Sequence, residues 1–159
     1  MSNKAIIIAA NPEINDDLGN VEKHKEHAEQ VGKVFWDLVP PGQREISWKH
    51  PEIQKGYFYI SGTGKIQYKF LIDKAGTVSE FKKSSLWNDE KKFIPKKIRN
   101  EQWEKSSYDY FFALLIKNIV KIDPISLEEF QLVNTGESAK RVMNYIIVKD
   151  DKRTTEVLS

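Results

Sequence analysis

Two β-rich runs separated by a glycine-containing turn place the strongest constraint on the fold of this chain. Tyr57–Ser61 and Lys65–Ile72 are joined by Gly62-Thr63-Gly64, a spacing typical of a β-hairpin. The second run alternates apolar and polar residues, as a strand with one buried face does. The apolar residues expected on that face are Ile66, Tyr68, Phe70 and Ile72. The other face, with Lys65, Gln67 and Lys69, is expected to contact solvent.

Other segments predict strands and a helix on either side of the hairpin. Ala5–Ala10 is a short apolar run stopped by Asn11-Pro12, which favours a buried strand. Residues from Leu18 to Val31 repeat near the helical period, with Asp16 or Asp17 as the expected N-cap and Gly32 as the expected end.

The C-terminal half predicts two further strands. Tyr110–Val120 is apolar on both faces, as expected of a central strand that is covered from two sides. After Pro124, Ser126 is expected to cap a short helix that runs through Phe130. Val142–Val148 is compatible with a helix or a strand by pattern, and its β-branched residues favour a last strand.

Length and composition predict one domain spanning residues 1–159. A chain of 159 residues with 40% apolar residues is large enough for one proper core. The sequence has no cysteine, which excludes disulfides and thiol chemistry, and its N-terminus lacks the features of a signal peptide. No apolar run approaches the roughly 20 residues of a membrane helix. We therefore expect a cytoplasmic protein without a membrane partner.

Charge is segregated along the chain although the formal net charge is only +2. Lys82–Lys105 holds eight basic and four acidic residues, whereas Glu13–Glu29 holds six acidic residues and two lysines. A cationic side opposite an anionic side would orient the molecule on a polyanion such as nucleic acid. The alternative is a solvated, lysine-rich loop.

Trp36 lies in the apolar run Lys33–Leu38, just before Pro40-Pro41-Gly42, a segment that continues neither a strand nor a helix. Its indole is therefore expected at the mouth of a strand, where a flat π-face can stack on an extruded base. The alternative is an ordinary core tryptophan.

The order of these segments resembles the PUA-like superfamily, and within it the EVE and YTH domains. The resemblance rests on the strand with Trp36, the hairpin Gly56–Phe70, a tryptophan in a basic loop, and Tyr110–Ile116. It implies an α+β fold, a partly open β-barrel flanked by helices, that binds modified bases in nucleic acid. Some such domains are the N-terminal DNA-reading domains of McrB-type restriction proteins.

The resemblance also implies an aromatic cage that holds a flipped, methylated base. Trp36 would form one wall, Trp87 a second, and Trp48 would lie close by. The base-binding residues expected are Trp36, Trp48, Trp87, Ser47, Tyr59, Ser61 and Asn88, although a purely structural role remains open for Tyr59. The phosphate-binding residues expected are Lys65, Lys82, Lys83, Lys96, Lys97 and Arg99.

No motif in the sequence predicts catalysis, a cofactor or a metal site. His24 and His27 have helical spacing, but their helix is highly charged, so we interpret them as part of a solvated face. Trp103 is interpreted as a loop anchor. The sequence thus predicts a non-catalytic reader of modified nucleic acid that prefers DNA to RNA and targets a restriction system, with a fused or associated motor or nuclease. The alternatives are a small-molecule or nucleotide-binding enzyme on the same fold and a lysine-rich scaffold for an acidic protein partner.

Overall fold

The computed structural model describes residues 4–10, 20–38, 50–95, 98–142 and 144–149. The strands are β1 (Lys4–Ala10), β2 (Val34–Leu38), β3 (Lys55–Ile60), β4 (Lys65–Thr77), β5 (Phe112–Ser126) and β6 (Tyr145–Lys149). The helices are α1 (Val21–Val31), α2 (Val78–Lys83), α3 (Trp87–Glu90) and α4 (Ile98–Glu104). Short 3-10 turns cover η2 (Lys91–Phe93), η3 (Ser106–Tyr108) and η4 (Leu127–Glu129).

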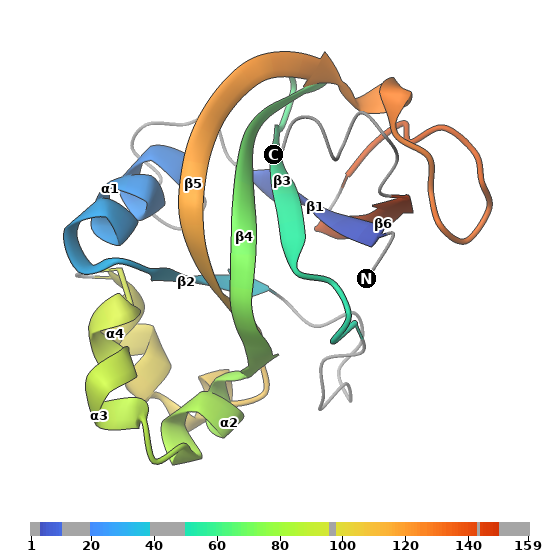
Figure 1. The fold of residues 1–159 in the computed structure, drawn as a ribbon. Coiled ribbons are helices and arrows are strands. Elements are labelled where there is room, and N and C mark those ends of the chain that lie inside the picture. Colours follow the sequence, from blue (N-terminus) through green and yellow to red (C-terminus); the bar gives the residue numbers. More distant parts are fainter. Residues whose placement is uncertain (1–3, 11–19, 39–49, 96–97, 143, 150–159) are drawn as a thin grey trace.

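The strands form one six-stranded sheet in the order β2-β5-β4-β3-β1-β6. The pair β1 and β3 is parallel and the other neighbouring pairs are antiparallel, so the sheet is mixed. Strands β2 and β6 form the two edges, which leaves the sheet open, and β4 and β5 curve strongly along their length (Figure 1). The expected α+β architecture, a partly open β-barrel flanked by helices, is confirmed, and its curved six-stranded sheet is not closed.

The main core lies against one face of this curved sheet and beneath α1. Its buried residues are Ile6, Ile8, Ala10, Val21, Ala28, Val34, Trp36, Leu38, Ile53, Phe58, Ile60, Tyr68, Phe70, Phe112, Leu114, Ile116 and Ile119. Alternate residues of β1 point to the opposite face and pack in a second cluster with Tyr57 and Phe130. The sheet is therefore covered on both faces at its β1 end.

Strand β1 and helix α1 confirm the elements expected from the N-terminal sequence. The side chain of Asn20 accepts a hydrogen bond from the backbone N–H of Lys23 at 3.1 Å and so caps α1. Gly32 ends the helix with a φ of 100°, a left-handed conformation that glycine adopts without strain. The expected cap was wrong, because Asp16 and Asp17 precede the observed start by several residues and lie outside the described residues.

The hairpin is confirmed as β3 and β4, but its face pattern is not the one expected. Ile66 pairs with Tyr59, whereas Tyr68 pairs with Phe58, so one extra residue of β4, Gln67, lies between these two pairs. A bulge of this kind reverses the faces of the residues that follow it. Ile66 therefore packs in the second cluster, whereas Tyr68, Phe70 and Ile72 face the main core.

The C-terminal elements are also confirmed, with shifted bounds. Residues 112–116 of β5 are all buried, as expected of a strand covered from two sides, and β5 continues through Pro124 to Ser126. Ser126 and Glu129 form the expected capping box, although they bound a single 3-10 turn rather than a helix through Phe130. The last strand is observed as β6.

Helix α1 contradicts two expectations about charge. His24 and His27 are buried, so the helix face that carries them is not solvated. The Nε2 atom of His27 lies 2.8 Å from the carbonyl oxygen of Lys92, at hydrogen-bond distance. The described part of the acidic segment therefore touches the basic segment and does not lie opposite to it.

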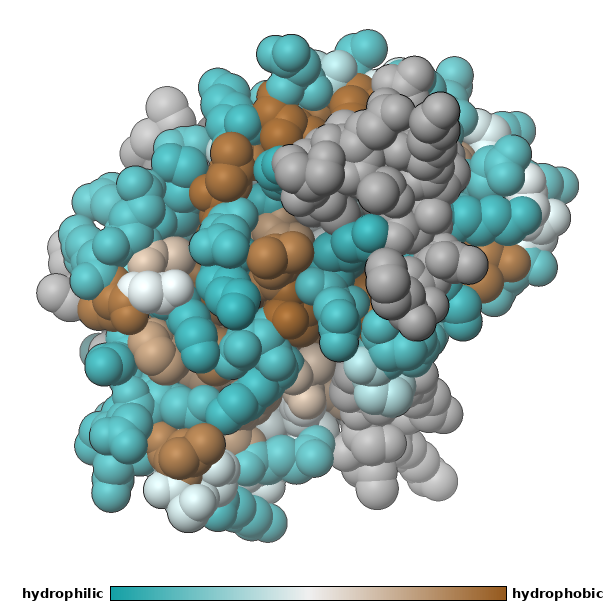
Figure 2. All heavy atoms as spheres, in the orientation of Figure 1, coloured by the Kyte–Doolittle hydropathy of each residue, from teal (hydrophilic) through white to brown (hydrophobic). Residues whose placement is uncertain are grey.

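The face shown in Figure 2 is largely hydrophilic, with smaller apolar patches along the curved strands. None of the described helices is long and apolar enough to cross a membrane.

Candidate ligand-binding hollow

An aromatic cluster lies on the face of β2 and β5 away from the main core and is covered by α2, α3 and α4 (Figure 1). Its rings belong to Phe35, Phe81, Trp87, Phe93, Trp103, Tyr108 and Phe111. Trp87 and Trp103 stack with centroids 5.6 Å apart and an angle of 6° between their planes. Phe35 meets Phe81 edge-on at 4.8 Å. Such pairs add stability beyond the area they bury.

A partly buried hydrogen-bond network fixes this cluster to β2. The Nε1–H group of Trp103 donates to the carboxylate of Asp37, at 3.1 Å from Oδ1, and the hydroxyl of Tyr108 donates to Oδ2 of the same carboxylate. Trp103 is only 1% exposed. Its interpretation as an anchor is therefore confirmed, and sequence analysis missed its partner Asp37.

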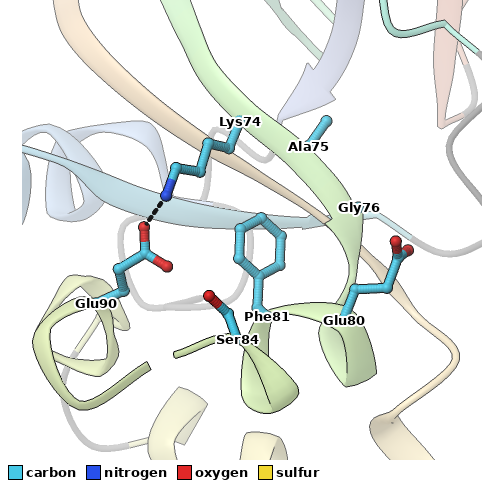
Figure 3. Close-up of a pocket in the computed structure, with 7 residues that line it drawn as sticks. All are labelled: Lys74, Ala75, Gly76, Glu80, Phe81, Ser84 and Glu90. Atoms are coloured by element: carbon cyan, nitrogen blue, oxygen red, sulfur yellow. Dashed lines mark hydrogen bonds and ion pairs between the residues drawn. The ribbon is translucent and has the colours of Figure 1, made fainter. Parts of the chain in front are cut away.

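Next to this cluster is a hollow of about 360 Å³ between the end of β4 and the helices α2 and α3 (Figure 3). Its lining residues are Lys74, Ala75, Gly76, Glu80, Phe81, Ser84 and Glu90. Phe81 belongs both to the hollow and to the aromatic cluster, so the ring in its wall is held from behind by Phe35.

A second bulge in β4 brings Lys74 to this hollow. Ile72 pairs with Ile116 and Lys74 with Leu115, which leaves one extra residue, Asp73, between the two pairs. Ile116 faces the main core and Leu115 faces the aromatic cluster, and directly paired residues share a face. The bulge therefore turns Lys74 toward α3.

Lys74 and Glu90 form an ion pair across the hollow. The Nζ atom of Lys74 lies 2.6 Å from Oε2 of Glu90, and the glutamate is only 6% exposed. The other oxygen, Oε1, is buried and has no hydrogen-bond partner among the described residues. Figure 3 shows it directed toward Phe81 and Ser84.

Glu80 lines the hollow in a different way. Its Oε1 atom accepts from the backbone N–H of Thr77 at 2.9 Å, and the hydroxyl of Thr77 accepts from the backbone N–H of Glu80. This capping box begins α2 and sets the direction in which the helix leaves β4. The carboxylate of Glu80 is thus occupied by the fold, unlike Oε1 of Glu90.

Two further hollows lack a buried charged side chain in their lining. One of about 510 Å³ lies beside β6, near His50 and Tyr145, and one of about 320 Å³ lies over β4 and β5, near Asn118 and Val120. The hollow at Glu90 is therefore the stronger candidate site.

The expected position of Trp36 at the mouth of β2 is wrong. Trp36 is 4% exposed and packs in the main core, with its rings 4.4 Å from those of His24 and of Phe58, measured between centroids. Neighbouring residues of a strand point to opposite faces, and Phe35 is the residue of β2 that meets the aromatic cluster. Trp36 and Trp87 therefore lie on opposite sides of β2 and do not enclose a common cage.

The remaining base-binding candidates are divided between two ends of the sheet. Trp87, half-buried, and Asn88, exposed, lie on α3 beside the hollow, although neither lines it. Tyr59 is half-buried against the second cluster, and Ser61 is exposed in the turn that follows β3, so both are near the hairpin. Ser47 and Trp48 lie outside the described residues.

The phosphate-binding candidates are divided in the same way. Lys82 and Lys83 end α2 near the hollow, and Lys82 forms an ion pair with Asp109. Lys65 is at the opposite end of β4 (Figure 1). Lys96, Lys97 and the side chain of Arg99 lie outside the part of the chain that the structure describes. Lys91 and Lys92, two exposed lysines in η2, belong to the basic segment and are not among the predicted phosphate-binding residues.

These features define a small α+β domain with a ligand-sized hollow that is aromatic on one side and charged on the other. Among the described residues no group of three His, Cys, Asp or Glu side chains could hold a metal ion.

Comparisons with known proteins return distant structural similarities. No protein-family model matches the chain, and no curated protein matches it. The backbone is similar to the crystal structure of ASCH from Zymomonas mobilis, with 13% identity, a TM-score of 0.49, and coverage of 99% of this chain and 94% of that one. It is also similar to a YTH domain from Zygosaccharomyces rouxii in complex with N6-methyladenosine RNA, with 7% identity, a TM-score of 0.39, and coverage of 97% and 84%. At these levels of sequence identity and TM-score, neither structure assigns residue roles or an activity to this chain.

Proposed function

We propose that this protein binds a nucleic-acid strand and holds one base in the hollow at Glu90 without converting it chemically. The observation that carries the proposal is the mixed wall of the hollow, with the ring of Phe81 on one side and the Lys74–Glu90 pair on the other. Small-ligand sites of roughly 300–1,000 Å³ combine an apolar lining with a few polar groups in this way. A single base is a ligand of suitable shape, since its faces are apolar and its edge is polar.

Cations near the hollow support a strand rather than a free base. Lys83, Lys91 and Lys92 are exposed on α2 and η2, the elements that flank α3. Ammonium groups at these positions can contact phosphates on either side of a bound base, which positions the strand without reading its sequence.

The finer parts of the proposal rest on the resemblance to EVE and YTH domains alone. On that basis we propose that DNA is preferred to RNA, that the preferred base carries a methyl group, and that the chain serves as the targeting part of a modification-dependent restriction system. Matched DNA and RNA strands with and without the methyl group test the first two statements.

The hollow is tested by filling it. Ser84→Leu should project an apolar side chain into the hollow, whereas Ser85→Leu places the same side chain at an exposed neighbouring position that does not line it. Because stacking is worth about 1–3 kcal/mol per base, we expect Ser84→Leu to weaken binding of a fluorescent 12-nucleotide strand by about tenfold. Ser85→Leu should leave the affinity within a factor of about two. Equal affinities for both variants would contradict the proposed site.

The phosphate contacts are tested by salt. The slope of log K against log [salt] should become shallower by about one in Lys83→Ala, which removes one phosphate contact, and should be unchanged in Lys65→Ala at the far end of β4. If lysine substitutions abolish binding while Ser84→Leu has no effect, the chain is a charged scaffold rather than a base reader. Recovery of a chemically altered strand after incubation would contradict the non-catalytic part of the proposal.

A further inference from the structure

We propose that Glu90 makes the hollow selective for bases that carry an amino group rather than a keto group at C6 of a purine or C4 of a pyrimidine, namely adenine, cytosine and their N-methyl derivatives. The inference rests on the proposed base-binding function and adds the chemical class of base. The sequence predicts no role for Glu90 beyond one charge in the segment Lys82–Lys105.

The geometry of Glu90 leaves one acceptor to be filled. Oε2 is engaged by Lys74 at 2.6 Å, whereas Oε1 is buried without a hydrogen-bond partner among the described residues. Buried polar atoms in folded proteins are nearly always hydrogen-bonded, and an unsatisfied charged group is among the most costly exceptions. A ligand in the hollow in front of Oε1 can therefore supply the missing donor.

An exocyclic amine on a flat ring supplies such a donor in the right surroundings. The ring of Phe81 can pack against one face of a base, which would leave the polar edge of the base toward Glu90. The amine donates one N–H to Oε1, and a single N-methyl substituent still leaves one N–H for this contact. The ring nitrogen beside the amine is an acceptor, which the ammonium of Lys74 or the hydroxyl of Ser84 can satisfy.

A keto group at the same place cannot donate to Oε1 of Glu90 and presents a second acceptor to it. Hypoxanthine and uracil carry an oxygen where adenine and cytosine carry the amine, so this oxygen and Oε1 of Glu90, both acceptors, would face each other without a hydrogen between them. Glutamate is accordingly suited to bases that present an amino group.

The experiment uses four DNA strands that differ only in one central base, which is adenine, hypoxanthine, cytosine or uracil. The full chain should bind the adenine strand about tenfold or more tightly than the hypoxanthine strand, and the cytosine strand more tightly than the uracil strand by a similar factor. Glu90→Gln should reverse the order, because the amide can donate to a keto oxygen.

The matched control is Glu80→Gln, which changes the other carboxylate in the wall but keeps an acceptor for the cap of α2. This variant should retain the preference of the unmodified protein. If the Lys74–Glu90 pair has only a structural role, Glu90→Gln should change the free energy of unfolding but should not reverse the preference for amino bases over keto bases.

The outcomes separate the two proposals. Binding of all four strands with equal affinity overturns the selectivity of Glu90 and leaves the proposed function standing. Binding of none overturns both. If Glu90→Gln fails to fold, the affinities of the unmodified protein for the four strands still test the selectivity. Equal affinities refute it, and a tenfold preference for amino bases supports it.

Discussion

Trp36 offers the clearest test of how the structure divides its tryptophans between core and site. Its indole is 4% exposed and contacts His24 and Phe58 in the main core. Replacement of a buried tryptophan by alanine removes these contacts and leaves a cavity, which typically costs about 3–5 kcal/mol. For a chain of 159 residues this corresponds to a fall in Tm of about 6–20 °C.

Urea unfolding followed by far-UV circular dichroism measures this cost for Trp36→Ala. Trp87→Ala is the matched control, since Trp87 is only half-buried and should cost less. Trp36→Phe keeps an aromatic ring in the core and should bind nucleic acid as the unmodified protein does. A cost of less than about 1 kcal/mol for Trp36→Ala would contradict the placement of Trp36 in the core, and loss of strand binding by a fully folded Trp36→Phe would contradict its separation from the site.

Three further substitutions probe the rest of the fold. Asp37→Asn weakens the acceptor for the indole N–H of Trp103 and should lower the free energy of unfolding by about 1–3 kcal/mol in urea titrations; an unchanged midpoint would show that the network is not stabilising. Gly56→Ala places a Cβ 2.8 Å from the backbone oxygen of Ile6, so we expect a loss of about 1–3 kcal/mol, and a Tm equal to that of the unmodified protein would contradict the packing of β1 on β3. Burial lowers the pKa of His50 below its ordinary value of 6.5, so the unfolded chain binds this proton more readily than the folded protein. The free energy of unfolding should therefore fall as the pH drops below about 6.5, and His50→Gln should flatten that part of the urea-midpoint profile; identical profiles would exclude the effect.

Elements with a regular pattern could be predicted from the sequence. The glycine-containing turn and the alternation of apolar and polar residues after it predict the hairpin, because a strand with one buried and one exposed face alternates in this way. Gly32 predicts the end of α1 because a left-handed residue terminates a helix. The run of residues in β5 that is apolar on both faces likewise predicts a central strand.

The faces of the strands could not be predicted to the same degree. Bulges at Gln67 and Asp73 each reverse the alternation of β4, and no local signal marks either position. Strand β2 is apolar on both faces, so its sequence alone does not say whether Phe35 or Trp36 meets the aromatic cluster. The expected cage around Trp36 depended on that choice.

The candidate site depends on contacts between segments distant in sequence. Glu90 is one acid in a charged run, and its burial follows from the fold of α3 over the end of β4. Lys74 reaches it only because of the bulge at Asp73. Composition identified a basic segment, but it gave no reason to select one carboxylate within it.

The most direct test of the proposed site is an NMR titration of the isotope-labelled protein with a methylated, adenine-containing DNA strand. If a base binds in the hollow, the largest backbone amide shifts should fall between Lys74 and Glu90. Shifts concentrated instead around Trp36 and the turn Ser61–Lys65, with none between Lys74 and Glu90, would contradict the proposed site.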